Sequence, residues 1–469
     1  MHSKSQESCV AVSILLVLLA LSFSACGRTE EAGDTLIPNG KDVRAQDAAP
    51  SQVDALPGKA SSLIRPADLV YQGAFRLPEG SGGSNWEYSG YAMTYYPGGD
   101  PKGPDDGYPG SLFAVGHDHH QLVSEIRIPV PVISASKNPD ELNTASTLQG
   151  FHDITGGRFG RLEIPRAGLA YLPPQGQQKT GKLHFCWGQH FQFELAPSHG
   201  WSETDLSSPK TSGMWRLGDY TNYVTNDYLF EIPEEWAARN TPGLRLATGR
   251  FRDGTWGGLG PALLAYGPWN EGNPPPPGAR LKRVTPLLLY GRNVKGAPEI
   301  SVSNEMKMDG FREADEWSGG AWLTAGKKAA VILVGTKALG KTWYGFANGV
   351  VYPTSGNPDE KIPEVPRWPY DQRGWWSEGI AAQILFYDPA DLARVAKGAR
   401  ETWEPQPYAA MNIDEHLFDP GFNHERWKRY LLGAVGFDRA RGLLYVIERR
   451  ADGDKSLVHA FRIKDDAVH

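Results

Sequence analysis

Short apolar runs that end in glycine and a polar residue recur along the chain, and they limit the fold more than any other feature. Each run has the length of one strand and is too short for an ordinary helix. The runs are LFAVGH (112–117), HFCWGQ (184–189), LLLYGR (287–292), VILVGT (331–336) and, with Glu448 in place of the glycine, LYVIER (444–449). A unit that recurs in this way predicts a repeat architecture.

Other short segments accompany each run. A second apolar segment precedes it, and Gly, Pro or charged residues join the two, which predicts a β-hairpin. These preceding segments are 90–97, 167–174, 260–267, 320–326 and 433–438. A third segment follows most pairs, at 122–129, 227–233, 382–389 and 456–463. A fourth, with glycine shortly before phenylalanine, recurs at 150–152, 249–252 and 310–312, and also at 73–76.

Four strands per unit, repeated five times, predict an all-β fold, a β-propeller with five blades. The glycines of the first four runs are 72, 103 and 44 residues apart, and only the last spacing suits a bare four-stranded blade. We therefore expect long insertions at about 190–226 and 340–380. Insertions of this size leave six or seven blades open, and a β-sandwich with irregular repeats is the competing fold.

The position of the last unit predicts how the ring closes. That unit ends near residue 463, after its third strand, while residues 68–77 (DLVYQGAFRL) resemble the missing fourth strand. A strand from the N-terminal side would complete the last blade and remove an exposed sheet edge. The predicted propeller therefore covers residues 67–469.

The N-terminal residues resemble an export signal. Lys4 precedes an apolar stretch at 9–25, and Phe23-Ser24-Ala25-Cys26 resembles the lipobox of bacterial lipoproteins. That resemblance implies a signal peptide at 1–25, a lipidated Cys26 and a location in the bacterial cell envelope, with the lipid as the one membrane contact. An ordinary secretory signal is the alternative. Residues 26–66 are polar and lack hydrophobic periodicity, as expected of a flexible tether.

The composition of the chain narrows the range of possible binding partners. The 469-residue chain has a formal charge of −6 and no basic stripe, which argues against nucleic acid. Gly (54) and Pro (36) exceed the average share and indicate many turns. Beyond the export signal the chain has a single cysteine, Cys186, so we expect a buried thiol and no intramolecular disulfide. We expect a monomer.

In a four-stranded meander, the loops between second and third strands lie on the same face as the loops that lead into each blade. The second strands would therefore bring one ring of residues to one mouth of the propeller: His117, Gln189, Arg292, Thr336 and Arg449, followed by Asp118, His190, Asn293, Lys337 and Arg450. The loops leading into the blades would add Tyr88, Trp256, Trp317 and Tyr430, and the long insertions Tyr223, Trp375 and Trp376. Arg, Lys and His around a funnel attract anions, and exposed aromatic rings stack on sugars. Packing against the rim is the alternative for these tryptophans.

These residue types suit elimination on an acidic polysaccharide. The reaction needs a base, an acid for the leaving oxygen and a cation for the uronate carboxylate. His117 or His190 would be the base, and Tyr88, Tyr223 or Tyr430 the acid. The substrate-binding residues would be Gln189, Arg292, Lys337, Arg449, Trp256, Trp317, Trp375 and Trp376. In these roles the residues resemble those of the propeller-fold polysaccharide lyases.

Three other hypotheses remain open. The first is a non-catalytic surface propeller that binds glycan or protein. The second is a glycoside hydrolase, which needs paired carboxylates such as Asp118, Asp315, Glu316 or Glu378. The third is a metal held by His117 and His190; apart from it, the sequence predicts no cofactor.

Overall fold

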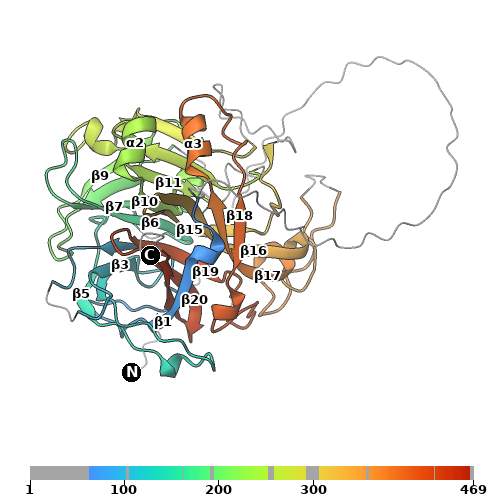
Figure 1. The fold of residues 1–469 in the computed structure, drawn as a ribbon. Helices are drawn as coiled ribbons and strands as arrows, with labels where there is room; N and C mark the ends of the chain where they lie inside the picture. Colours follow the sequence, from blue (N-terminus) through green and yellow to red (C-terminus); the bar gives the residue numbers. More distant parts are fainter. Residues whose placement is uncertain are drawn as a thin grey trace, which may run out of the picture. The chain divides into compact units, whose positions relative to one another are not determined.

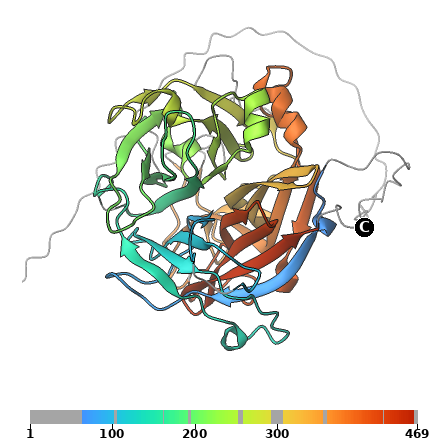
Figure 2. The same cartoon turned by 60° about the vertical axis from the view of Figure 1, so that its left-hand side comes forward.

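The structure, a computed structural model, describes residues 63–101, 105–160, 162–190, 195–251, 258–291, 306–354, 359–426 and 428–464. The chain divides into two compact units, Met1–Lys59 and Ala60–His469, and all described residues belong to the second. This second unit is all-β and forms five small sheets arranged as a five-bladed propeller, which confirms the predicted fold and blade number. Figures 1 and 2 show the five sheets around a common centre.

Each blade is an antiparallel meander whose first strand lies nearest the axis. Blade 1 contains β2 (Met93–Tyr96), β3 (Ser111–Val115), β4 (Val123–Arg127) and β5 (Thr147–His152). Blade 2 contains β6 (Pro165–Leu172), β7 (Lys182–Gln189), β8 (His199–Ser202) and β9 (Ser212–Leu217), with β13 (Arg280–Leu281) pairing in parallel with β9. Blade 3 contains β10 (Tyr228–Glu231), β11 (Leu246–Arg250), β12 (Ala262–Tyr266) and β14 (Val284–Leu288).

The last two blades follow the same plan. Blade 4 contains β15 (Glu316–Ala325), β16 (Lys328–Phe346), β17 (Arg373–Tyr387) and β18 (Ala409–Asn412). Blade 5 contains β19 (Leu432–Asp438), β20 (Leu443–Asp452), β21 (Lys455–Ile463) and β1 (Leu69–Arg76). The helices are α1 (Asn222–Thr225), α2 (Glu234–Asn240) and α3 (Pro389–Ala396), with 3-10 turns at Pro66–Asp68, Pro139–Glu141, Pro268–Asn270 and Asp414–His416. None of the described helices is long and apolar enough to cross a membrane.

The N-terminal strand closes the ring as predicted. Strand β1 pairs antiparallel with β21, from Leu69 opposite Ile463 to Arg76 opposite Leu457. The chain packs against the propeller before β1 begins, because Ile64 is buried. Its backbone N–H donates to the Ala329 carbonyl, and its carbonyl accepts the Tyr408 hydroxyl. Residues 63–66, at the end of the expected tether, are therefore part of the folded unit.

The centre of the propeller is closely packed. Glycines on the first strands let neighbouring blades approach: a Cβ on Gly168 would lie 2.8 Å from the backbone of β10, and one on Gly433 would overlap the carbonyl of Gly90. A cavity of only about 10 Å³ remains on the axis, lined by residues from the first strands of all five blades. The described part of the chain therefore leaves little room for a ligand at this point on the axis.

Several predicted strand positions along the chain were wrong. Residues 190–226, expected to be an insertion, contain β8 and β9, so they supply half of blade 2. Segment 227–233, expected as a third strand, contains β10, the innermost strand of blade 3. The segments 260–267 and 287–292 consequently hold the third and fourth strands of blade 3, rather than its first and second.

The insertion expected at 340–380 is an arm of blade 4. Strands β16 and β17 continue as one ladder past Thr336, and the pairing runs from Val331 opposite Tyr387 to Phe346 opposite Arg373. The turn of this hairpin carries exposed Ile362 and Trp368. We call residues 337–381 the blade 4 arm. It extends from the end at which the second strands finish.

Candidate functional site at the propeller mouth

The second strands of the blades finish at one axial end, which we call the mouth. The residues that reach it are His117 after β3, Gln189 and His190 at the end of β7, Arg250 at the end of β11, Thr336 on β16, and Arg449 and Arg450 on β20. The repeat thus brings most of the predicted ring together. In blade 3, however, the position belongs to Arg250, because Gly249 pairs with Tyr228 of the first strand as Gly335 does with Trp317. Arg292, predicted for this place, lies outside the described residues.

A buried ionic network lies beneath the mouth. Arg166, at the start of β6, donates to both carboxylate oxygens of Glu316 at 2.8 and 3.3 Å and also lies 3.4 Å from Asp227. Arg250 Nε is 3.8 Å from the same Asp227 carboxylate. All four side chains are almost fully buried. The network joins blades 2, 3 and 4, so it fixes the geometry of the mouth.

Burial and the charges of this network shift the pKa values of its members. Burial alone would raise the pKa of Glu316, but Arg166, with a smaller contribution from Arg449, lowers it to about 2. Burial raises the pKa of Asp227 despite Arg166 and Arg250. Burial also lowers the pKa of Arg250. Glu316 therefore stays ionised and tied to Arg166, an arrangement that suits a structural anion better than a catalytic acid.

Two arginines at the mouth flank one tyrosine. The guanidinium carbons of Arg429 and Arg449 lie 4.9 and 5.7 Å from the ring centre of Tyr430. Among the residues that the structure describes, no carboxylate lies within ion-pair distance of either arginine. The Tyr430 hydroxyl hydrogen-bonds Glu316, and burial raises the pKa of Tyr430 to about 12. Two arginines that form no salt bridge with a described carboxylate thus flank a protonated phenol.

Glycines make room for both arginines. The aliphatic stem of Arg449 passes over Gly90, where a Cβ would lie 2.9 Å from it and where φ is +120°. The Arg429 guanidinium crosses Gly374 of the blade 4 arm, and a Cβ there would lie 2.7 Å from a guanidinium nitrogen. Arg429 also donates to the Trp375 carbonyl at 2.7 Å and lies 4.6 Å above the Trp376 ring. The arm therefore positions Arg429.

A histidine, a tyrosine and an arginine meet between blades 1 and 5. The rings of His117 and Tyr88 are 5.2 Å apart, edge to face, and the Arg450 guanidinium lies 4.4 Å above Tyr88. The Tyr88 hydroxyl donates to Asp454 at 3.3 Å. Burial, followed by Asp454, raises the pKa of Tyr88, while burial lowers the pKa of His117. At neutral pH the imidazole is therefore neutral and the phenol protonated.

A second group of three side chains, from Arg250, His190 and Tyr223, lies between blades 2 and 3. Arg250 donates to His190 Nδ1 at 2.6 Å and to the His190 carbonyl at 2.9 Å. Its guanidinium also stacks 4.0 Å from the Tyr223 ring, which is buried. Tyr223 therefore lies below the surface of the mouth and supports Arg250, away from the position that a catalytic acid would need.

The hydrogen bonds of the two histidines indicate where their protons lie. His117 Nδ1 accepts the backbone N–H of His119 at 3.1 Å, and His190 Nδ1 accepts from Arg250. A neutral imidazole that accepts at Nδ1 carries its hydrogen on Nε2. His117 is then a hydrogen-bond donor at Nε2, and the arginines beside it donate through their guanidinium N–H groups. The mouth is therefore rich in donors, which suits an anionic ligand.

Three other predicted residues form hydrogen bonds or an ion pair within the protein. Gln189 accepts the backbone N–H groups of Glu163 and Ile164. Lys337 is paired with Asp315 at 2.8 Å, and Thr336 accepts the backbone N–H of Leu431. These contacts tie strands together at the mouth.

The predicted tryptophans do not form a ring of stacking surfaces. Trp317 is 0% exposed in the core, so no ligand can reach it. Trp376 is buried under Arg429, and Trp375 packs against Tyr344 within the arm. Trp256 and Cys26 lie outside the described residues. The packing alternative therefore holds for Trp317 and Trp376.

The sequence also predicts Arg166 in a loop leading into a blade at the mouth, but it missed Arg250 at this end. The signal for Arg250 is present, since LATGRF (246–251) has the same glycine-polar ending as the other second strands. Nothing in the sequence around Arg166 indicates its partners, because Asp227 and Glu316 belong to other blades.

Neither the possible metal ligands nor the comparisons with known proteins assign a function to this site. The described part of the chain holds no group of three or more His, Cys, Asp or Glu side chains able to bind a metal ion. The single described thiol, Cys186, is buried, and burial raises its pKa to about 12. No protein-family model matches the chain, and a search of curated proteins found no match.

Proposed function

We propose that the mouth binds an anionic saccharide through a uronate or sulfate group. The observation that supports this most is the pair Arg429 and Arg449, which flank Tyr430 and form no salt bridge with a described carboxylate. An arginine fork matches the planar geometry of a carboxylate. The Nε2–H group of His117 would add a donor at the same mouth.

Binding to matched oligosaccharides tests this proposal. Arg449→Gln should weaken binding of a uronate oligosaccharide by about ten- to a hundredfold, because a hydrogen bond to a charged group contributes about 1.5–3 kcal/mol. Isothermal titration would measure it, and a neutral oligosaccharide should bind little to either protein. Arg441→Gln is the control, because Arg441 lies in the β19–β20 hairpin of the same blade at the opposite end. Equal affinity of wild type for the neutral and acidic sugars would refute the proposal.

Elimination is a second candidate, supported by the contact of His117, Tyr88 and Arg450. His117 would take the proton beside the uronate carboxylate, the bond from the neighbouring carbon to the glycosidic oxygen would break, and a carbon–carbon double bond would form. Tyr88 would protonate the departing oxygen. This role needs an unprotonated Nε2, so His117 must adopt the other tautomer, in which the proton is on Nδ1 and faces the Asp118 carboxylate 3.2 Å away.

One assay separates the two candidates. A lyase produces an unsaturated uronate that absorbs in the ultraviolet, and His117→Gln should abolish that signal while binding persists. Binding without any absorbance change across a panel of uronate polysaccharides would leave the binding function alone standing.

We also propose that the protein is exported and anchored to the bacterial envelope by a lipid on Cys26. The lipobox-like segment supports this. In addition, the chain enters the folded unit at Leu63 beside Ala329, at the β15–β16 hairpin, which is at the end opposite the mouth. A tether would therefore leave the mouth accessible. Cys26→Ser should move the protein from the membrane fraction to the soluble fraction.

A further inference from the structure

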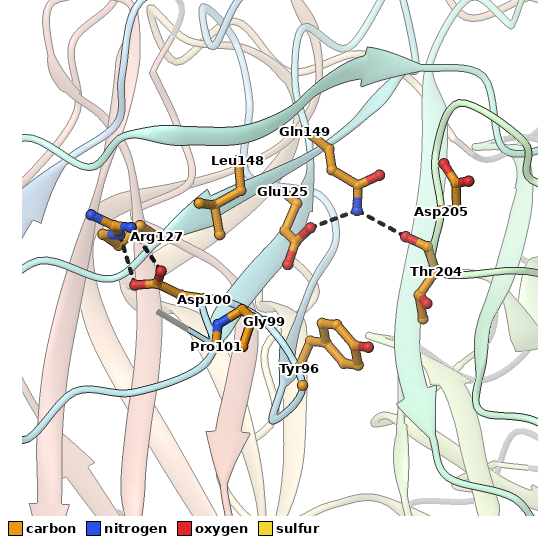
Figure 3. A pocket seen from close by; sticks show the side chains of 11 residues that line it. Tyr96, Gly99, Asp100, Pro101, Glu125, Arg127, Leu148, Gln149, Thr204 and Asp205 are labelled. Atoms are coloured by element: carbon orange, nitrogen blue, oxygen red, sulfur yellow. Dashed lines mark hydrogen bonds and ion pairs between the residues drawn. The ribbon is translucent and has the colours of Figure 1, made fainter. Parts of the chain in front are cut away.

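A pocket of about 490 Å³ opens at the end of the propeller opposite the mouth (Figure 3). Its walls come from blade 1 and from the loop between β8 and β9 of blade 2. A volume of this size is typical of sites for small molecules. The lining residues that carry the argument are Tyr96, Asp100, Glu125, Arg127, Gln149 and Asp205.

Hydrogen bonds across the two blades hold the pocket in shape. Gln149 donates to Glu125 at 2.6 Å and to the Thr204 carbonyl at 2.9 Å, and its own oxygen accepts the backbone N–H of Leu206. Gly99 lies directly over the Ser111 hydroxyl, where a Cβ would overlap it. The walls are therefore formed before any ligand binds.

Glu125 contributes a buried carboxyl group that has no positive partner among the described residues. Its side chain accepts from Ser111 at 2.5 Å and from Gln149, and both of these donors are neutral. Glu125 is only 5% exposed, and among the described residues no cation lies within ion-pair distance of it. Buried charges in proteins are normally paired, because desolvation is costly.

The neighbouring arginine does not balance this charge. Arg127 lies two residues along β4 from Glu125 and is bound by both oxygens of Asp100 at 2.7 Å, so the two neutralise each other. Asp205 adds an exposed carboxylate at the rim. The pocket therefore offers carboxylates and carbonyls as acceptors, while the donors of Arg127 and Gln149 are engaged.

Tyr96 supplies an aromatic wall of fixed orientation. Its ring packs edge to face on Tyr171 at 4.7 Å and lies 5.4 Å from Phe113. An aromatic face attracts a cation that has lost part of its water. Figure 3 shows Tyr96 and Glu125 on the same pocket.

From these observations we infer that this pocket binds a small organic ammonium ion, such as the protonated amine of an amino sugar. The ammonium supplies the missing counter-charge to Glu125, and its N–H groups match a pocket made of acceptors. A hydroxyl-bearing ring would fill the remaining volume beside Tyr96. This site is separate from the mouth and does not depend on its function.

Titration with glucosamine, at a mildly acidic pH that keeps its amine charged, tests the proposal. Wild type should bind glucosamine and should bind N-acetylglucosamine, which lacks the charge, at least about tenfold more weakly. Glu125→Gln keeps the size of the side chain and one acceptor oxygen opposite Gln149, while its NH2 group can donate to the Ser111 hydroxyl. It removes the charge, so it should weaken glucosamine binding about tenfold or more. Asp205→Asn, on the exposed rim, should cause a smaller loss and serves if the first variant does not fold.

The control is Arg449→Gln at the mouth, which should leave glucosamine binding unchanged. Equal binding of the amine and the acetamide would overturn the proposal, as would a Glu125→Gln protein that folds and binds like wild type. Binding of calcium ion in place of glucosamine, lost in Glu125→Gln, would also overturn it by making the pocket a metal site.

Discussion

Arg166 lies below the mouth and holds together residues that are far apart in the chain. Its partner Glu316 is 150 residues away and Asp227 is 61 residues away. Removing one member of such a group leaves the others buried without a partner, which typically costs about 3–5 kcal/mol. The network therefore makes the mouth rigid only as long as every member is present.

Glu316→Gln should destabilise the fold in a pH-dependent way. The pKa of Glu316 is about 2 in the folded protein and about 4.3 in an unfolded chain, so the folded state favours its ionised form. This contribution is complete above about pH 4.3 and is lost as the pH falls toward 2. We expect wild type to be more stable than the variant by about 3 kcal/mol at neutral pH. The difference should shrink over this acidic range.

Urea denaturation at a series of pH values would measure that difference. A gap between the two proteins that stays constant down to pH 2 would show that the charge of Glu316 contributes nothing.

The sequence pattern predicted the positions of some residues of the site and missed others. His117 and Arg449 could be placed at the mouth because a strand that ends in glycine and a polar residue repeats around an axis. The pairing of Arg166 with Glu316 could not be predicted, since it depends on the distance between blades. The burial of Trp317 could not be predicted either, because aromatic residues occur both in cores and at binding surfaces.

Among the elements, blade 3 shows why the repeat was assigned incorrectly. In a meander the second and fourth strands run in the same direction, so an apolar run ending at a glycine fits both positions. LLLYGR begins with the last two residues of the fourth strand, β14, whereas the second strand is the less apolar LATGR of β11. Strands β8 and β9 were missed because β8 has four residues and both contain glycine and serine.

The blade 4 arm leads to a prediction about one glycine. Gly374→Ala would push a methyl group against the Arg429 guanidinium, so we expect about a tenfold loss of affinity for an anionic saccharide with little change in folding. Gly379→Ala, on the same strand β17, is the control, because its Cβ would meet Leu339 at an ordinary 3.6 Å. The titration described for Arg449 measures both. An equal effect of the two substitutions would contradict a positioning role for the arm.

For the molecule as a whole, ring closure by β1 should control stability. Phe75 is fully buried on β1 and lies 6.5 Å from the Tyr445 ring of β20. Phe75→Ala should therefore cost about 3–5 kcal/mol in the free energy of unfolding, measured with urea. Val70→Ala, at a partly exposed position of the same strand, should cost much less. A small loss for Phe75→Ala would mean that the ring stays folded without this packing.

The closing strand also has a mechanical consequence. A pull on the chain before Leu63 that acts in the direction of β1 would load the strand along its pairing with β21, from Leu69 to Arg76. In this direction the seven register pairs with β21 carry the load together. A force perpendicular to the strand would break the same pairs one after another. The propeller is therefore held at its N-terminal side in the direction in which a β-ladder resists tension best.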